Sequence, residues 1–398
     1  MFKLLEMLLI ITSLISNSFI GFLMLYALII TFIGKRNTLT NPYEVLSELP
    51  EVSVIIPVRD EFNVLEESLS RLMVVNYPLN KLKIYIGVDK DCIKCLEVCK
   101  AFTPNVVPVI VSSKGKPAVL NELLRMVDSD YVLLLDCDSL ITSNSIVDLI
   151  NAIIRYDVCG VTGIPRPSNQ CSGTLPKFFL VESILWQKLM AGKDYLRLIV
   201  QAPGYFTLLK RSCIELIGYW DEESLAEDND LTLRIYALGS RIKLISSKVY
   251  IESPTKLRIL IKQRIRWYKG TLEVLRRRWR LLNKMRPLLK FDAFITFISP
   301  ISPTLLLIAV LSNTLLGGIY NLITIALIAP QLITPLLVDE GLDLNTKAKI
   351  TLLTLPYVLV NSIASLIAVL TLLANVKIGW WRTEKYGRIT TCKNAPVA

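Results

Sequence analysis

Two carboxylates separated by a single residue are the strongest candidate for chemistry in this sequence. Asp136 and Asp138 directly follow the apolar run 131–135, which has the composition of a buried strand. A bend at a strand end lets both side chains approach one divalent cation, and such a cation can neutralise the charge on a diphosphate leaving group. The competing interpretation is that both aspartates are solvated and precede the next helix, near Thr142.

A second acidic group, residues 226–231, precedes a helical pattern that runs toward Gly239. Acidic side chains are favoured near the positive end of the helix dipole, and this preference explains most such sequences. The functional interpretation is that one carboxylate of this group faces a pocket and acts as a general base. It would accept the proton of an attacking hydroxyl.

Two basic segments are suited to anionic or sugar ligands. Arg266 lies in an amphipathic stretch, where it could clamp a phosphate, and the adjacent Trp267 could stack on a sugar ring. Both residue types are also common anchors at a membrane surface. The loop 113–118, which contains Lys116, precedes a helical run and suits an anionic group. It lacks the spacing of a P-loop, and no dinucleotide-binding glycine motif follows the first strand.

The elements that must position these groups alternate along residues 51–250. Buried strands are expected at 52–56, 82–88, 106–111 and 131–135, and helices are expected at 61–75 and 116–127. The alternation predicts βαβ units and a mostly parallel sheet, with ligands bound beyond the carboxyl ends of the strands.

Apolar segments flank this α/β region on both sides. Residues 7–33 are long enough to cross a bilayer, and Lys35 and Arg36 follow them, so the positive-inside rule puts this end in the cytoplasm. Residues 254–290 predict amphipathic interfacial helices. Three further apolar stretches span 291–312, 316–338 and 350–375, and a basic tail follows. Three full crossings would put that tail outside the cell, so we expect an even number.

Composition excludes several kinds of site. The 398-residue chain carries a formal charge of +11 and has no histidine. Histidine triads and histidine-ligated metals are therefore ruled out, which leaves acid–base work to carboxylates and favours Mg or Mn on oxygen ligands. Much of the basic charge borders apolar runs, which favours a membrane over nucleic acid as partner. Cys92, Cys95 and Cys99 could form a zinc site or a disulfide, but free thiols around a helix are the favoured interpretation.

Together, these segments resemble the family-two inverting glycosyltransferases, in particular membrane members such as cellulose synthase, hyaluronan synthase and ceramide glucosyltransferase. The resemblance covers roughly residues 50–285. Residues 54–61 resemble the family's opening strand and turn, although Asp60 stands where asparagine is common. Asp89 resembles the acidic residue that contacts the nucleotide base, with Asp91 as the alternative. Gly115 and Lys116, with Leu120 and Asn121, are similar to the family's G-K-x-x-A-L-N loop, and Asp136 and Asp138 match the D-x-D motif.

Three other motifs lie in the second half of the resemblance. Glu227 and Asp228 match the acidic pair of the T-E-D motif, with alanine in place of threonine. Residues 263–267 match Q-x-x-R-W, and residues 204–206 with 210–211 resemble the strand and turn that line the acceptor site. The tail segment 381–385 is also similar to a segment of some relatives.

The resemblance implies a role for each matched residue. Asp228 and Glu227 would be catalytic, with Asp228 as the base, and Asp136 and Asp138 would hold the metal. The donor would be bound by Glu61, Asp89, Lys116, Asp136 and Arg266. The acceptor would be bound by Gly204, Gln263 and Trp267.

The implied fold is α/β of the GT-A type, with transmembrane helices at both ends. We expect an N-terminal transmembrane helix (1–36), a GT-A domain (50–252), interfacial helices (253–290), C-terminal transmembrane helices (291–375) and a basic tail (376–398). The implied enzyme is a hexosyltransferase, a multi-pass protein of the cell membrane whose catalytic domain is cytoplasmic.

The implied reaction is a metal-dependent, inverting transfer from a nucleotide sugar, with a UDP-sugar favoured as donor. The acceptor would be a lipid or a growing glycan, and Q-x-x-R-W mildly favours a processive synthase, whereas the few membrane segments favour single addition. A non-catalytic scaffold or glycan-transport protein with a decayed transferase domain is the alternative, and intact carboxylates at Asp136, Asp138 and Asp228 argue against it. A nucleotidyltransferase would not explain Q-x-x-R-W beside a membrane.

Overall fold

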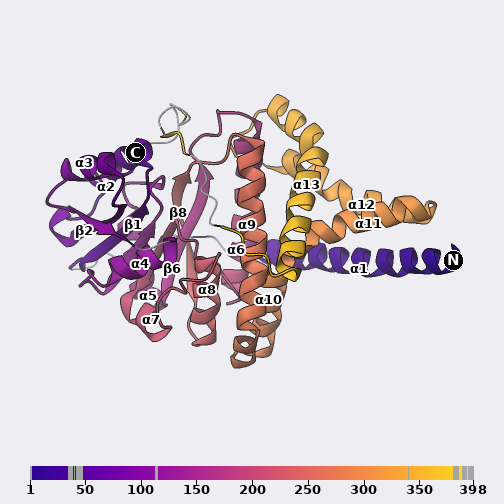
Figure 1. Cartoon of the computed structure of the whole chain (residues 1–398), viewed down its shortest axis with the longest axis horizontal. Helices are drawn as coiled ribbons and strands as arrows, with labels where there is room; N and C mark the ends of the chain where they lie inside the picture. Colours follow the sequence, from indigo (N-terminus) through magenta and orange to yellow (C-terminus); the bar gives the residue numbers. More distant parts are fainter. Residues whose placement is uncertain are drawn as a thin grey trace.

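The computed structural model describes residues 2–34, 39, 41, 48–112, 115–338, 340–379, 385–387 and 392. The basic pair Lys35 and Arg36, the loop residues 113–114 and the tail segment 381–384 lie outside these ranges. Long apolar helices project from one side of an α/β domain (Figure 1).

An eight-stranded mixed sheet forms the centre of the domain, in the order β3-β2-β1-β4-β7-β6-β8-β5. Its strands are β1 (Val52–Val58), β2 (Leu82–Asp89), β3 (Val106–Val111), β4 (Tyr131–Leu135), β5 (Leu140–Ile141), β6 (Gly160–Pro167), β7 (Phe206–Lys210) and β8 (Ile242–Ile251). The first four strands are parallel, as the sequence predicts.

The prediction of a mostly parallel sheet holds for the pair β6 and β8 as well, but it is wrong for β7 and β5. Strand β7 runs antiparallel to both β4 and β6, and β5 runs antiparallel to β8. The reason is the long helix α6 (Thr174–Tyr195), which follows β6 and returns the chain to the sheet in the opposite direction.

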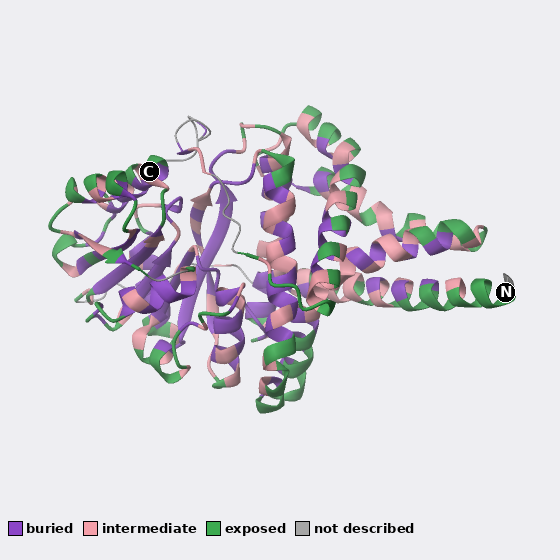
Figure 2. Ribbon diagram, viewed as in Figure 1, coloured by how far each residue is buried: buried purple, intermediate pink, exposed green. Residues whose placement is uncertain are grey.

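Helices cover both faces of the sheet. Neighbouring strand residues point to opposite faces, so Val54 and Ile56 pack into one core while Ile55 packs into the other. Burial on both faces explains the continuous apolar run of β1 (Figure 2). The first core contains α2 (Phe62–Leu72), α3 (Ile93–Lys100) and α5 (Ser145–Tyr156). The second contains α4 (Lys116–Leu124), α7 (Arg211–Leu216) and α8 (Glu227–Ala237).

Four helices in the described part of the chain are long and apolar enough to cross a membrane, which indicates an integral, multi-pass membrane protein. These segments are Lys3–Gly34, Pro287–Leu316, Ile319–Leu337 and Leu344–Leu373. The first belongs to α1 (Phe2–Gly34), and the second joins α10 (Pro287–Ile298) to α11 (Ser302–Leu316). The other two are α12 (Ile319–Ile333) with its 3-10 extension and α13 (Leu344–Leu373).

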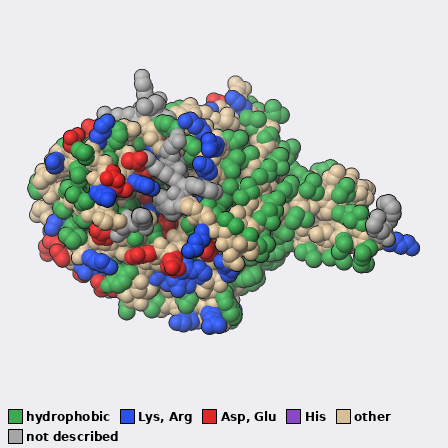
Figure 3. All heavy atoms as spheres, viewed as in Figure 1, with side chains coloured by type: hydrophobic (Ala, Val, Ile, Leu, Met, Phe, Trp, Pro, Cys, Tyr) green, Lys and Arg blue, Asp and Glu red, His purple; other side chains and the backbone are tan. Residues whose placement is uncertain are grey.

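Helices α1, α11 and α12 project together, whereas α13 runs beside α9 (Leu257–Arg278) across their base (Figure 1). A polar network joins the projecting helices, because Asn313 of α11 accepts a hydrogen bond from Ser13 at 2.6 Å and donates one to Thr324 at 3.0 Å. Apolar side chains cover this projection and the band at its base (Figure 3). Because α13 packs against α9 on one side, its other face is exposed and apolar, and this face includes Leu352, Leu359 and Leu370.

Buried charges tie the membrane helices to the domain. Lys193 of α6 forms an ion pair with Asp292 of α10 at 2.9 Å, and both side chains are almost fully buried. Tyr26 of α1 donates a hydrogen bond to the same Asp292 carboxylate. Gly34 and Gly192 let α1 and α6 approach closely, since a Cβ added at Gly192 would lie 2.0 Å from the Ile30 carbonyl oxygen.

Candidate active site

Asp136 and Asp138 lie in a tight turn just beyond the carboxyl end of β4. The Ser139 amide donates a hydrogen bond to the Asp136 carbonyl at 3.0 Å, and the Ser139 hydroxyl donates one to the Tyr205 carbonyl at 2.8 Å. The turn is therefore fixed against the chain that enters β7. Because β1, β2 and β4 are parallel, their carboxyl ends share this edge of the sheet.

Lys116, the first residue of α4, connects the two acidic segments. Its Nζ atom lies 2.6 Å from Asp136 Oδ1 and 3.2 Å from Glu227 Oε1. Burial alone would lower the pKa of Lys116, but the two carboxylates outweigh this effect and raise it, so the side chain is a buried cation. Gly204 leaves room for the ammonium group, since a Cβ added there would lie 2.8 Å from Lys116 Nζ.

Asp228 has the environment of a general base. It lies in the first turn of α8, where its carboxylate accepts a hydrogen bond from the Asn229 amide at 2.8 Å. Burial and then the neighbouring Glu227 raise the pKa of Asp228 to about 6, while Lys116 and Arg266 act in the opposite direction. A carboxylate with a pKa close to the working pH is both ionised and basic enough to accept a proton.

The Q-x-x-R-W residues lie in the middle of α9, and Arg266 among them lies near Asp228. Arg266 is close enough to Asp228 to lower its pKa electrostatically. The Gln263 Oε1 atom is buried and has no hydrogen-bond partner among the described residues, so it is available to a ligand. The Trp267 ring instead packs against the Arg264 guanidinium, whose carbon lies 4.9 Å from the ring centroid.

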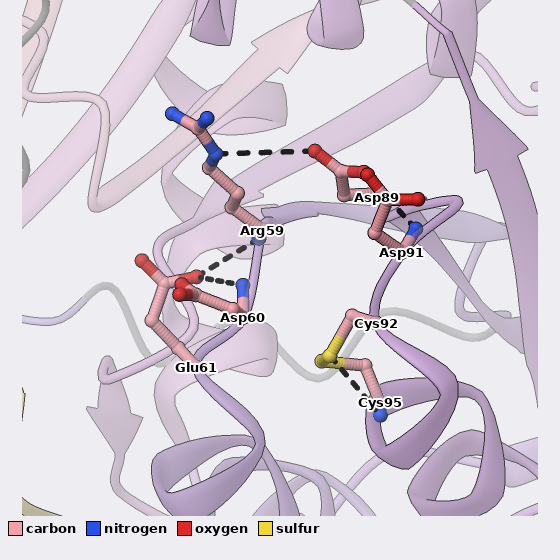
Figure 4. Close-up of a disulfide and its surroundings, with 7 residues drawn as sticks. All are labelled: Arg59, Asp60, Glu61, Asp89, Asp91, Cys92 and Cys95. Carbon is pink, nitrogen blue, oxygen red and sulfur yellow. Dashed lines mark hydrogen bonds and ion pairs between the residues drawn. A yellow bond between two sulfur atoms is a disulfide. The ribbon is translucent and has the colours of Figure 1, made fainter.

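Arg59 lies between Glu61 and Asp89 at the ends of β1 and β2 (Figure 4). The Glu61 carboxylate accepts a hydrogen bond from the Arg59 amide at 2.9 Å, and the Arg59 guanidinium lies 3.9 Å from Asp89. Asp89 also accepts a hydrogen bond from the Asp91 amide at 3.2 Å. The Asp89 side chain is 37% exposed, so a ligand can reach it.

The cysteine prediction is wrong in part. Cys92 and Cys95 form a disulfide at the start of α3 (Figure 4), while Cys99 remains a buried free thiol. The α3 turn brings Cys92 close enough to pair with Cys95 three residues later, which residue spacing alone does not establish.

The two aspartates fit a hard divalent cation that is shared with a diphosphate. The described residues hold no group of three metal-ligating side chains, so a metal here would rely on the two carboxylates. Mg²⁺ commonly uses one or two carboxylates and completes its shell with water and substrate phosphates. Burial raises the pKa of Cys137, the residue between them, so its thiol is protonated and a poor metal ligand.

Sequence reasoning missed two residues that contact Asp138. The Asp138 Oδ2 atom accepts a hydrogen bond from the Glu252 amide at 2.9 Å and one from Lys385 Nζ at 2.6 Å. Lys385 lies 247 positions away in the sequence. The tail segment 381–385 was the only sequence signal that pointed to this region.

This mixed sheet, with carboxylates at its carboxyl edge and long apolar helices at both ends, defines a GT-A-like domain joined to membrane helices. The profile of "Glycosyl transferase family group 2" matches residues 131–377, more than half of the chain, so the chain belongs to this family of glycosyltransferases.

Known relatives agree with this assignment. The chain is 27% identical over 272 residues to the probable glycosyltransferase YdaM of Bacillus subtilis, a match that covers 64% of this chain and 65% of that protein. It is 28% identical over 242 residues to a poly-beta-1,6-N-acetyl-D-glucosamine synthase of Staphylococcus aureus, covering 58% and 57%. The chain thus spans less than two thirds of the length of both relatives.

One solved structure shares the fold over nearly the whole chain. The mannosyltransferase PcManGT from Pyrobaculum calidifontis, solved in complex with GDP-Man and Mn²⁺, has a TM-score of 0.69 and 17% sequence identity. The match covers 92% of this chain and all of that chain.

Proposed function

We propose that this protein transfers a hexosyl group from a nucleotide sugar, with a UDP-sugar favoured, to a lipid or growing glycan at the cytoplasmic membrane face. The observation that carries the proposal is the Asp228 carboxylate, with its pKa of about 6, next to the cluster of Lys116, Asp136 and Glu227. This arrangement places a general base, Asp228, beside the Lys116 ammonium, which is suited to a diphosphate.

The proposed reaction is a single displacement with inversion. Asp228 accepts the proton of the acceptor hydroxyl while that oxygen forms a bond to the anomeric carbon. The bond from that carbon to the diphosphate breaks, and the nucleoside diphosphate leaves with the electron pair. Lys116 and Arg266 offer positive charge to the leaving group, and Glu227 holds Lys116 in place.

A divalent Mg or Mn ion, held by Asp136 and Asp138, would stabilise the charge on the diphosphate. Glu61 and Asp89 are proposed to contact the nucleotide, because they lie at the same edge of the sheet as the aspartates. Gly204, Gln263 and Trp267 are proposed to line the acceptor site. The buried, unpartnered Gln263 Oε1 atom supports this role because it can accept a hydrogen bond from a sugar hydroxyl.

The membrane arrangement supports a cytoplasmic active site and single addition. Basic residues cluster at the last turn of α9, which includes Arg276, Arg277 and Arg278, and basic surfaces are typical of the cytoplasmic side. If α13 lies in the interface, as its single apolar face suggests, only α1, α11 and α12 cross the bilayer. Three helices are few for a self-sufficient polysaccharide channel.

The test is release of nucleotide by the purified full-length chain in lipid, with Mg²⁺ or Mn²⁺, across a panel of nucleotide sugars. Release from one donor that disappears in Asp228→Asn would support the transferase and identify the sugar. The length of the glycan product would then separate single addition from processive synthesis. An absence of release from every donor, even with added cell lipids, would contradict the proposal and favour a non-catalytic scaffold.

A further inference from the structure

The C-terminal tail returns to the catalytic domain beyond α13. We call residues 385–387 together with Cys392 the tail strap. Residues 385–387 lie against Asp138 and Glu252, at the edge of the sheet that carries the candidate site. These contacts place the tail on the same side of the membrane as the domain. The stretch of chain that joins the domain to the tail therefore crosses the membrane an even number of times.

Backbone contacts hold the tail strap at the end of β8. The Tyr386 amide donates a hydrogen bond to the Glu252 carboxylate at 2.9 Å, and the Gly387 amide donates another at 3.0 Å. Gly387 has a φ of +60° and packs so tightly that an added Cβ would lie 2.8 Å from the Asn63 carbonyl oxygen. The Tyr386 ring also lies 5.1 Å from the Lys256 ammonium. This part of the tail is therefore built into the domain surface.

The strap presents the Lys385 ammonium to one oxygen of Asp138. That oxygen, Oδ2, accepts both the Lys385 bond of 2.6 Å and the Glu252 amide bond of 2.9 Å. The Lys385 and Asp138 side chains are only 15% and 5% exposed. The structure shows no bond to the other oxygen, Oδ1, from the described residues, so the carboxylate is oriented with one oxygen left for a ligand.

This geometry differs from that of a lysine that replaces a metal ion. An ion shared by the two aspartates would lie between them. Lys385 instead donates hydrogen bonds to Asp138 and to the Glu252 carbonyl, and the ammonium partner of Asp136 is Lys116. Hydrogen bonds to the outer oxygen of a coordinating carboxylate fix its orientation and commonly affect metal affinity strongly.

A disulfide closes the strap covalently. Cys392 bonds to Cys171, which lies 221 positions earlier in the loop between β6 and α6, and the Cys392 amide donates a hydrogen bond to the Ser168 carbonyl at 3.1 Å. A cross-link over so long a stretch of chain removes much of the freedom the tail would otherwise have.

We propose that Lys385 is a positioning residue that orients Asp138 for a divalent cation, and that the Cys171–Cys392 disulfide keeps it there. This inference rests on the proposed metal role of Asp138. In a reducing compartment, such as a glutathione-buffered cytoplasm on the side where we place the domain, this disulfide is open and the non-covalent contacts alone hold the strap. Metal affinity would then respond to the redox state of the tail.

The experiment measures Mn²⁺ binding by electron paramagnetic resonance on the full-length protein in lipid nanodiscs, first with Mn²⁺ alone and then with added UDP or GDP. Lys385→Met is expected to weaken Mn²⁺ binding by about 10- to 100-fold, the usual effect of losing such a partner. Lys385→Arg should recover part of the affinity. Lys377→Met is the matched control, because Lys377 is exposed and follows α13 without contacting the site.

The disulfide is tested in the same assay. Cys392→Ser, or reduction of the wild-type protein, should weaken Mn²⁺ binding and should have no further effect when Lys385 is already methionine. Reduction needs no substitution. Mn²⁺ binding by the reduced wild-type protein therefore still tests the role of the strap if Lys385→Met fails to fold.

The outcomes separate this inference from the proposed function. Unchanged Mn²⁺ binding in Lys385→Met would overturn the inference, and so would tighter binding, because it would show that the lysine competes with the metal. If Asp138→Asn abolishes binding while Lys385→Met does not, only the role of the tail strap fails. If the wild-type protein binds no Mn²⁺, even with a nucleotide, both the metal site and the strap role fail.

Discussion

Replacement of Asp228 by asparagine tests the proposed base with the least change in shape. General-base catalysis contributes about 10²- to 10⁴-fold, so turnover in Asp228→Asn should fall by that factor. Donor binding should stay within about threefold of the wild type. Lys116 and the metal site at Asp136 are unchanged and still stabilise the diphosphate. Calorimetry with UDP or GDP measures binding, and release of nucleotide measures turnover.

The pKa of Asp228 also predicts how activity depends on pH. The base acts only when ionised, so kcat/KM should rise about tenfold per pH unit up to about pH 6 and then level off. An ordinary aspartate, with a pKa of 3.8, would show no such loss near pH 5. The dependence should be absent from the residual activity of Asp228→Asn.

The same pKa shift predicts that the wild-type base costs stability. A shift from 3.8 to about 6 corresponds to roughly 3 kcal/mol against the ionised form in the folded protein. Because the folded-state pKa is raised, this stability is present below about pH 4 and is lost as the pH rises through 6. At pH 7.5 Asp228→Asn should therefore melt about 4 °C higher than the wild type, and near pH 4 the difference should vanish.

Three results would refute this reasoning. They are a loss of donor binding in Asp228→Asn as large as the loss of turnover, a pH profile unchanged by the substitution, and a lower melting temperature at pH 7.5. The last of these would show that the carboxylate contributes a structural contact that outweighs its desolvation cost.

Three further substitutions test the packing around the site and the membrane helices. Gly204→Val should weaken donor binding at least tenfold by calorimetry, because its Cβ would lie 2.8 Å from Lys116 Nζ and displace it; unaltered binding would contradict the role of Lys116. Gln263→Leu removes a buried oxygen without a partner, so thermal stability should hold or rise while transfer to acceptor falls. Gly192→Leu should lower the melting temperature by about 5 °C, since its Cβ would lie 2.0 Å from the Ile30 carbonyl oxygen; an unchanged melting temperature would mean that α1 moves freely.

The sequence predicts the parallel half of the sheet well because buried parallel strands have continuous apolar runs. The expected strands 106–111 and 131–135 coincide with β3 and β4, and the expected strand 52–56 falls short of β1 by two residues. The direction of β7 could not be predicted, since strand direction depends on where the long α6 returns the chain and not on local composition.

The candidate site could be assembled in part from the sequence. The carboxyl ends of parallel strands share one edge of a sheet, so the placement of Glu61, Asp89 and Asp136 at this edge follows from their positions at or beyond the ends of β1, β2 and β4. The contact between Lys385 and Asp138 joins residues 247 positions apart and depends on how the tail folds back. No periodicity or local motif encodes such a contact, and the same holds for Cys171 with Cys392.

The hydrogen bond between Tyr26 and Asp292 has a consequence for how the protein is made. Tyr26 is synthesised 266 residues before its partner, the difference between positions 26 and 292. At about 5–20 residues per second, a ribosome needs roughly 13–53 s to cover that distance. During this time α1 must reside in the bilayer alone, which its mean hydropathy of 2.1 allows. The packing of α1 against α10 is therefore a late event in biogenesis. It occurs after the strands of the sheet have already been translated.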